Sequence, residues 1–225
     1  MSFPELKNRL IEEGATVAGY ARVDEALMGE IGHLSRAVSV GVDRKLNSDT
    51  LRLLGALQKT TERFLRERGY RFLSIPPDSD RINDTFVSKL YSLFSHKVAA
   101  TCAGIGWVGK NGLLISPVYG PRLSLVTVLT DAPLKADGPI ERSRCGQCRL
   151  CVELCPSGAV SGEEWSRDNP FPDLIDYAAC SAHKESIRSL SGKPNCGFCI
   201  NICPYGRRQP KEDPRTIVVT VEDGE

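Results

Sequence analysis

The sequence lacks an excess of charge of either sign: 29 Lys and Arg residues are balanced by 28 Asp and Glu residues, which leaves a formal net charge of +1. Generic nucleic-acid binding depends on a strong positive field, so we do not expect nucleic acid as a partner. An apolar run of membrane length is also missing, since the longest one lies near LSLVTVLT (123–130). The first residues, MSFPELKNRLIEEG, lack the apolar core of a signal peptide. These absences predict a cytoplasmic protein without a membrane partner.

Material for a folded core, in contrast, is abundant, because 41% of the 225 residues are hydrophobic, which suffices for one domain or two small ones. Along the first part of the chain, apolar residues at helical spacing alternate with short segments rich in Val, Leu and Ile. Helices are predicted over 4–13, from Ser48 or Asp49 to 69, and over 84–102; strands are predicted within 15–20, 37–42, 70–75, 112–116 and 122–130. Helices interleaved with strands predict an α/β fold built in layers.

Cysteine is concentrated in one region, because eight of the nine cysteines lie between Cys145 and Cys203 and only Cys102 lies outside it. Disulfide frameworks are typical of short secreted chains, so we expect a cofactor site instead. CGQCRLCVELCP (145–156) has the spacing C-x2-C-x2-C-x3-C-P with which bacterial ferredoxins hold iron–sulfur clusters. CGFCINICP (196–204) repeats C-x2-C-x3-C-P, and Cys180 precedes it. The predicted fold class is therefore an N-terminal α/β sandwich domain followed by a bacterial-ferredoxin-like double 4Fe–4S module.

The polar segment LKADGPIERSR (134–144) separates the last predicted strand from the first motif cysteine, and we place the domain boundary there. This divides the chain into an α/β domain over 1–138, a double-cluster domain over 139–210 and a tail over 211–225. A short strand is predicted near the tail, over 216–221.

In cysteine motifs of this kind the fourth cysteine, which precedes proline, reaches the other cluster. This crossing rule gives each cluster four ligands and leaves none of the eight over. Cluster one is assigned Cys145, Cys148, Cys151 and Cys203, and cluster two is assigned Cys155, Cys180, Cys196 and Cys199. Structural zinc is the alternative, although zinc needs two well-separated ligand pairs around one ion; disulfides are a third interpretation. Five arginines flank the ligands, either for charge compensation and partner docking or as ordinary solvated surface: Arg142, Arg144, Arg149, Arg207 and Arg208.

GIGWVGKNG (104–112) matches two phosphate-binding motifs, G-x-G-x-x-G and part of a P-loop. Both motifs follow a strand and open a helix, whereas this segment is predicted to follow a helix and to enter the strand at 112–116. Asn111 also stands where a P-loop has Ser or Thr. We interpret the segment as a tight loop that lines another cofactor or the domain interface, with phosphate binding and a simple turn as alternatives.

Several segments, taken together, resemble a known family. KVAATCAGIGWVGKNGLLISPVYG, VTVLTDAPL, CGQCRLCVELCPSGAV, DYAACSAHKE and CGFCINICPYG follow one another as in the epoxyqueuosine reductase family and its shorter double-cluster relatives. The resemblance covers residues 97–206, and its AGxGWxGKN and TDxPL elements are more specific than the cysteines alone. It implies an N-terminal domain that holds cobalamin, toward which the two clusters relay electrons, as in the related reductive dehalogenases.

The chain departs from the tRNA-modifying members of that family in two respects. Those enzymes are longer and carry a C-terminal helical-repeat domain, whereas this chain ends soon after its last cluster ligand. Their proton-donating Asp lies in an Arg-Asp-Tyr-His stretch that is not found here, and Asp49, near the corresponding place, is at least as well explained as a helix cap. We therefore expect a shorter relative rather than an enzyme that acts on tRNA.

The resemblance and the glycine-rich loop together name candidate cofactor contacts outside the cysteines. His96 and Lys97 precede the loop, where they either contact a cofactor or are ordinary cations at a helix end; Trp107 either stacks on a flat cofactor or fills the interface. Cys102 is expected to be a small buried residue, with a reactive thiol or ligand as the alternative. His183 is expected to lie on a solvated helix, with donation to a cluster sulfide as the alternative. The predicted cofactor-binding set is His96, Lys97, Gly106, Trp107, Gly109, Lys110 and Asn111.

Two 4Fe–4S clusters and a cobalamin would make the protein a low-potential iron–sulfur oxidoreductase that receives electrons from a redox partner protein. As an enzyme it would reduce a bound corrinoid, or use it to reduce an organic substrate. Alternatively it is an electron carrier or activator for a partner corrinoid protein, or a module that uses its clusters structurally or as a redox sensor. The α/β domain favours the enzyme, because a carrier needs only the cysteine module, whereas the missing proton donor favours the carrier.

Overall fold

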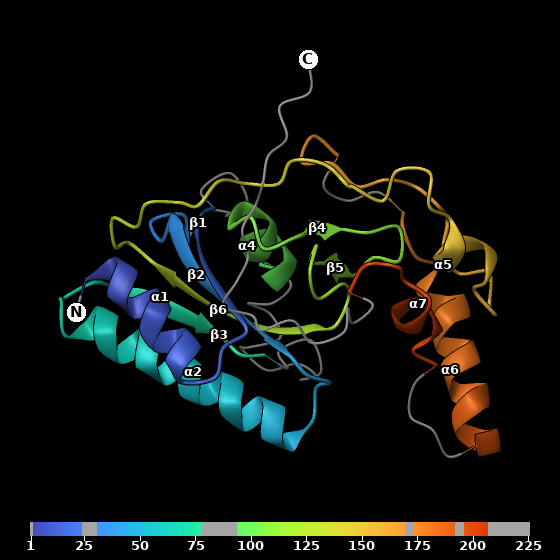
Figure 1. Cartoon of the computed structure of the whole chain (residues 1–225), viewed down its shortest axis with the longest axis horizontal. Coiled ribbons are helices and arrows are strands. Elements are labelled where there is room, and N and C mark those ends of the chain that lie inside the picture. Colours follow the sequence, from blue (N-terminus) through green and yellow to red (C-terminus); the bar gives the residue numbers. More distant parts are fainter. Residues whose placement is uncertain (1, 24–30, 78–93, 170–172, 192–195, 207–225) are drawn as a thin grey trace.

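The computed structural model describes residues 2–23, 31–77, 94–169, 173–191 and 196–206, which form a central sheet flanked by helices and a smaller C-terminal region (Figure 1). The helices are α1 (Phe3–Glu12), α2 (Ser48–Arg66), α4 (His96–Cys102), α5 (Leu150–Glu153), α6 (Tyr177–Ser191) and α7 (Phe198–Asn201). The strands are β1 (Val17–Arg22), β2 (Arg36–Asp43), β3 (Phe72–Ile75), β4 (Trp107–Val108), β5 (Leu114–Ile115) and β6 (Leu123–Thr130). The α/β prediction is confirmed. None of the helices in these ranges is both long and apolar enough to cross a membrane.

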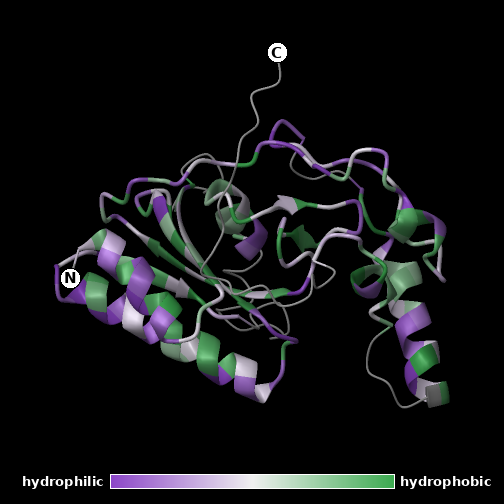
Figure 2. Cartoon of the chain, viewed as in Figure 1, coloured by the Kyte–Doolittle hydropathy of each residue, from purple (hydrophilic) through white to green (hydrophobic). Residues whose placement is uncertain are grey.

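Four antiparallel strands form the main sheet in the order β1-β2-β6-β3. Alternate side chains of the central strands point to opposite faces, as the pleat requires. Val38 and Val126 pack under α1 and α2, whereas Ala37 and Leu129 pack on the other face, with α4. Figure 2 shows hydrophobic and hydrophilic residues mixed along α1 and α2. This is expected for helices that pack one face on a sheet and expose the other face to solvent. The N-terminal part is therefore a sheet between two helical layers.

One predicted helix start is wrong, and a second predicted helix is not continuous over its predicted length. The N-cap of α2 is Asn47, whose side chain accepts a hydrogen bond from the Thr50 amide at 2.9 Å, rather than Ser48 or Asp49. The helix predicted over 84–102 begins at His96 in the described chain, because Ser95 has extended backbone angles and caps α4. Residues 84–93 of that helix, and the strand predicted over 216–221, lie outside the described residues.

The segment that follows β6 runs along the edge strand β1. The Asp137 amide donates to the Tyr20 carbonyl at 3.0 Å, and the Tyr20 amide donates to the Asp137 carboxylate at 2.7 Å. The Ile140 amide then donates to the carbonyl of Thr101 in α4 at 2.9 Å. The predicted linker is thus fastened to the α/β domain, and the division at residue 138 stays a prediction.

Gly55 lies inside α2, where a Cβ atom would meet no other atom within 4 Å. Gly55→Ala is therefore expected to raise the free energy of unfolding by about 0.5–1 kcal/mol, because alanine loses less backbone entropy in a helix. Chemical denaturation of both proteins measures the change. Gly41→Ala is the matched control and should destabilise, since its Cβ would lie 2.9 Å from Val17 Cγ2. A lower unfolding midpoint for Gly55→Ala than for the wild type would contradict this.

Candidate metal centre

The eight motif cysteines lie around three helices on one side of the chain. Cys145, Cys148, Cys151 and Cys155 surround α5, Cys180 is in α6, and Cys196, Cys199 and Cys203 surround α7. The hairpin of β4 and β5 lies between these helices and the main sheet (Figure 1). All nine cysteines lie among the described residues, and none of them forms a disulfide, which contradicts the disulfide interpretation. The eight motif cysteines are partly buried, and Cys102 is buried as predicted.

One group of four thiols lines a single cavity, and the group draws on both motifs. The cavity is lined by Cys145, Cys148, Cys151 and Cys203, together with Lys110, Asn111, Ile115, Pro204 and Tyr205. Burial, and then the thiols of Cys145 and Cys148, raise the pKa of Cys151 to about 11. Four thiolates this close together are therefore unfavourable without positive charge among them, and a cationic iron–sulfur core supplies it.

A second group of thiols surrounds Cys199 in α7. Burial raises the pKa of Cys199, and the thiols of Cys180, Cys196 and Cys155 raise it as well. Cys155 belongs to the first motif by sequence, yet its thiol is near the cysteines of the second. The last cysteine of each motif therefore lies with the cysteines of the other motif, which is the arrangement that the crossing rule requires. The ligand assignment itself stays a prediction.

The thiols are not arranged for the zinc alternative. Structural zinc needs four ligands around one ion, and among the residues described here no three His, Cys, Asp or Glu side chains are grouped so that they could hold a single metal ion. A four-iron cube instead offers each thiolate an iron of its own, so its ligands stand further apart.

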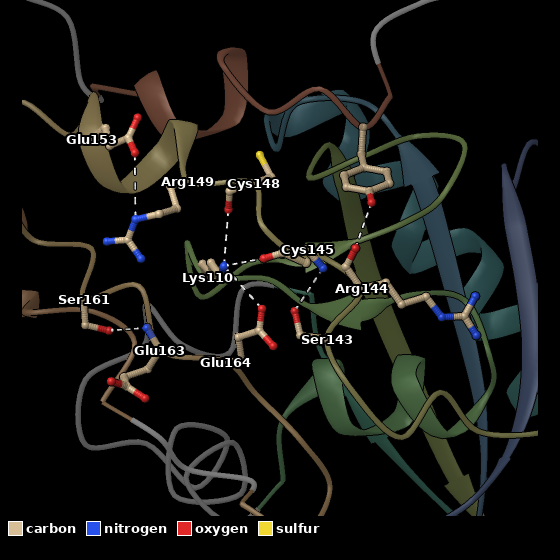
Figure 3. Close-up of polar contacts among 12 residues, drawn as sticks. Lys110, Ser143, Arg144, Cys145, Cys148, Arg149, Glu153, Ser161, Glu163 and Glu164 are labelled. Atoms are coloured by element: carbon tan, nitrogen blue, oxygen red, sulfur yellow. Dashed lines mark hydrogen bonds and ion pairs between the residues drawn. The ribbon is translucent and has the colours of Figure 1, made fainter.

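The glycine-rich loop between α4 and β5 contacts both cysteine groups through two consecutive residues, Lys110 and Asn111. Lys110 donates from Nζ to the carbonyls of Gly146 at 2.6 Å and Cys148 at 3.4 Å, and it pairs with Glu164 Oε1 at 3.3 Å (Figure 3). Asn111 donates from Nδ2 to the Cys199 carbonyl at 3.2 Å. The loop thus contacts the backbone of a cysteine segment from each group.

Gly106 and Gly109 allow this loop to pass close to β5. A Cβ on Gly106 would overlap the Ile115 carbonyl, and one on Gly109 would lie 2.6 Å from Ile115 Cγ1. The loop follows α4, as predicted, but it contains the short strand β4, which the sequence analysis missed. It opens no helix, so the context of both phosphate motifs is absent from these residues.

The other predicted cofactor contacts are engaged within the protein. The ring of His96 joins α4 to the sheet, with Nδ1 2.9 Å from Thr127 Oγ1 and Nε2 3.0 Å from the Pro76 carbonyl. Lys97 Nζ donates to the Gly112 carbonyl at 2.6 Å. Trp107 is 1% exposed and packs edge-on against Tyr205, with ring centroids 4.9 Å apart. A cofactor contact of these residues stays a prediction.

Two buried ring nitrogens near the motif cysteines have no hydrogen-bond partner among the described residues: Trp107 Nε1 and His183 Nε2. Trp107 belongs to an apolar group that includes Cys145 and Cys203. His183 follows Cys180 by three residues in α6, which places both on one side of the helix. α6 is largely exposed around His183, as expected, although this ring nitrogen is buried.

The environment of the remaining polar residues was harder to foresee from sequence. Cys102 Sγ accepts a hydrogen bond from Arg167 Nη1 at 3.1 Å, a contact that no sequence signal indicated. Of the flanking arginines, Arg142 and Arg149 are exposed and lie 3.8 Å from a carboxylate, which fits ordinary solvated surface. Arg207 and Arg208 lie outside the described residues.

The comparison with known proteins agrees with this geometry. Residues 144–206 match the family described as the 4Fe-4S double cluster binding domain. A curated epoxyqueuosine reductase from Leadbetterella byssophila is 33% identical over 114 residues, which cover 48% of this chain and 36% of that protein. Over the aligned residues the chain is similar to the epoxyqueuosine reductases. The resemblance inferred from the sequence is thereby confirmed, and the chain spans little more than a third of that relative.

Solved structures of epoxyqueuosine reductases and reductive dehalogenases share the fold. The epoxyqueuosine reductase from Streptococcus thermophilus superposes with a TM-score of 0.61 and 18% identity, covering 95% of this chain and 70% of that one. A reductive dehalogenase whose structure suggests a mechanism for B12-dependent dehalogenation superposes with a TM-score of 0.64 and 21% identity, covering 90% and 31%. At these identities the likeness concerns the fold alone.

Proposed function

We propose that this protein is a low-potential iron–sulfur oxidoreductase of the cytoplasm that passes single electrons through two 4Fe–4S clusters. The observation that carries the proposal is the presence of two adjacent four-thiol groups, each of which combines cysteines from different motifs. Cluster one is held by Cys145, Cys148, Cys151 and Cys203, and cluster two by Cys155, Cys180, Cys196 and Cys199. When bound, the cubes supply one-electron chemistry at low potential. The match to the double-cluster family supports this assignment.

The electron acceptor that we propose is a corrinoid held by the α/β domain. The likeness to a B12-dependent reductive dehalogenase supports it, because the shared fold covers 90% of this chain. The predicted contacts in the described chain do not offer free groups for such a ligand: Lys97, Lys110 and Asn111 donate to backbone carbonyls, and Trp107 is buried. We therefore route no chemical step through the corrinoid, and assign these residues to the contact between the domain and the clusters.

A second candidate function is electron transfer to a partner corrinoid protein. It is favoured by three large apolar side chains that are exposed near the cysteine helices, those of Leu154, Tyr177 and Phe198. Exposed apolar groups of this size often mark protein contact sites. Epoxyqueuosine reduction on tRNA receives less support, because the net charge of +1 offers no general attraction to RNA.

Addition of cob(II)alamin to the reconstituted protein separates the two candidates. The protein is purified without oxygen and loaded with iron and sulfide, and EPR spectra are recorded with excess protein. We expect the cobalt signal to change to its base-off form, since the fold would replace the lower nucleotide ligand by its own surroundings. Cob(II)alamin without protein is the control.

An unchanged cobalt signal at excess protein contradicts the corrinoid acceptor and leaves the carrier function. The cluster proposal is tested separately in the same sample, by iron and acid-labile sulfide. We expect about eight of each per chain; zinc, or no metal, in anaerobically prepared protein would contradict it.

A further inference from the structure

Lys110 is the one Lys, Arg, Asp or Glu residue that is buried within the described ranges, with a side chain that is 6% exposed. Its Nζ donates to the backbone carbonyls of Gly146 and Cys148 (Figure 3), and the residue is part of the wall of the cluster-one cavity. The carboxylate of Glu164, 3.3 Å away, is 49% exposed and is therefore partly screened by water. A buried ammonium without a buried counter-charge is unfavourable unless an anion lies next to it.

The clusters supply such an anion in the proposed function. A 4Fe–4S core of about +2 with four thiolates has a net charge of about −2, which becomes about −3 on reduction. A fixed positive charge next to the cluster favours the more negative, reduced form, and the effect is large where water is excluded. Lys110 lines the cavity of cluster one, whereas the contact of the same loop with the cluster-two group is made by the neutral Asn111.

We infer that Lys110 makes cluster one easier to reduce than cluster two, so that electrons enter at cluster two and collect at cluster one beside the α/β domain. This inference rests on the proposed function. The positions of the two cysteine groups support this direction of electron flow. The cluster-one cavity is walled by Lys110, Asn111 and Ile115 from the α/β part of the chain. The exposed apolar residue Phe198 lies next to Cys199 of the other group and offers a docking point for an electron donor. Lys110 is thus a positioning residue for electron flow.

Potentiometric titration of the loaded protein, followed by EPR, tests the inference. Lys110→Met is expected to reduce the ratio of reduced to oxidised cluster one at least tenfold at the wild-type midpoint, which is about 59 mV for one electron. The cluster-two midpoint should stay unchanged. Lys110→Arg keeps the positive charge and should restore the wild-type midpoint. Lys184→Met is the matched control, because Lys184 is an exposed cation on α6, four residues from Cys180, and its removal should shift neither midpoint.

Glu164→Gln tests the same effect on the cluster-one potential without a substitution of the buried Lys110. Removing the partly exposed carboxylate should move the cluster-one midpoint to a more positive potential, opposite to Lys110→Met. Equal shifts of both clusters, or no shift in either variant with both clusters loaded, overturn the inference while the proposed function stands. Failure of the wild-type protein to bind about eight irons would instead overturn the proposed function.

Discussion

Alanine variants of Cys145 and Cys203 are expected to lose the same cluster and to keep the same other one, although the two residues belong to different motifs. Both thiols line one cavity with Cys148 and Cys151, so either substitution leaves a cube with three thiolate ligands. Each variant should bind about four irons per chain in place of about eight. The remaining cluster should have the same EPR spectrum and midpoint potential in both variants.

Variants of Cys155 and Cys180 give the reciprocal result. They should lose cluster two and keep cluster one, because their thiols lie near Cys199. If each motif instead bound its own cluster, Cys155→Ala would leave the same cluster as Cys145→Ala, and the crossed assignment would be wrong. Cys102→Ala is the control: its thiol is buried, accepts a hydrogen bond from Arg167 and does not line the cluster-one cavity, so the iron content should not change.

The sequence alone indicated which segments form the strands of the sheet, but not the order in which those strands lie side by side. Short runs rich in Val and Leu mark β2 and β6, because both faces of these strands are buried. That β6 lies between β2 and β3 depends on contacts between segments far apart in the chain, which no local pattern records. Helix starts were also uncertain, because Asn47, Ser48 and Asp49 are all good caps and only the backbone geometry selects one of them.

At the candidate site, the spacing of the cysteines predicted the kind of cofactor because ligand spacing is local chemistry. The role of the glycine-rich loop was not predictable in the same way. Lys110 and Gly146 are 36 residues apart, and Asn111 and Cys199 are 88 apart. A side chain that holds a distant backbone carbonyl has the same sequence signature as one that holds a cofactor. Lys110 and Asn111 were therefore found by motif, while the groups that they contact required the fold.

Gly120→Ala is expected to be strongly destabilising and to weaken cluster one. Gly120 has a φ of +58°, and a Cβ on it would overlap the carbonyl of Tyr205, two residues after the cluster-one ligand Cys203. Gly206, which has a φ of +72°, lies against Tyr119 and Gly120, and Arg122 donates to its carbonyl. The substitution therefore adds backbone strain to a clash between two backbone segments, and should cost more than about 3 kcal/mol of unfolding free energy.

Gly69→Ala separates these two contributions. Gly69 has a similar φ of +74°, but a Cβ there would meet nothing within 4 Å, so only strain of about 1–2 kcal/mol is expected. Thermal unfolding of both loaded variants measures the difference. If the clash displaces Tyr205 and with it Cys203, the residual EPR spectrum of Gly120→Ala should match that of Cys203→Ala, while Gly69→Ala keeps both clusters. Equal losses of stability in the two variants, with both clusters retained, would mean that the C-terminal segment does not pack against Gly120.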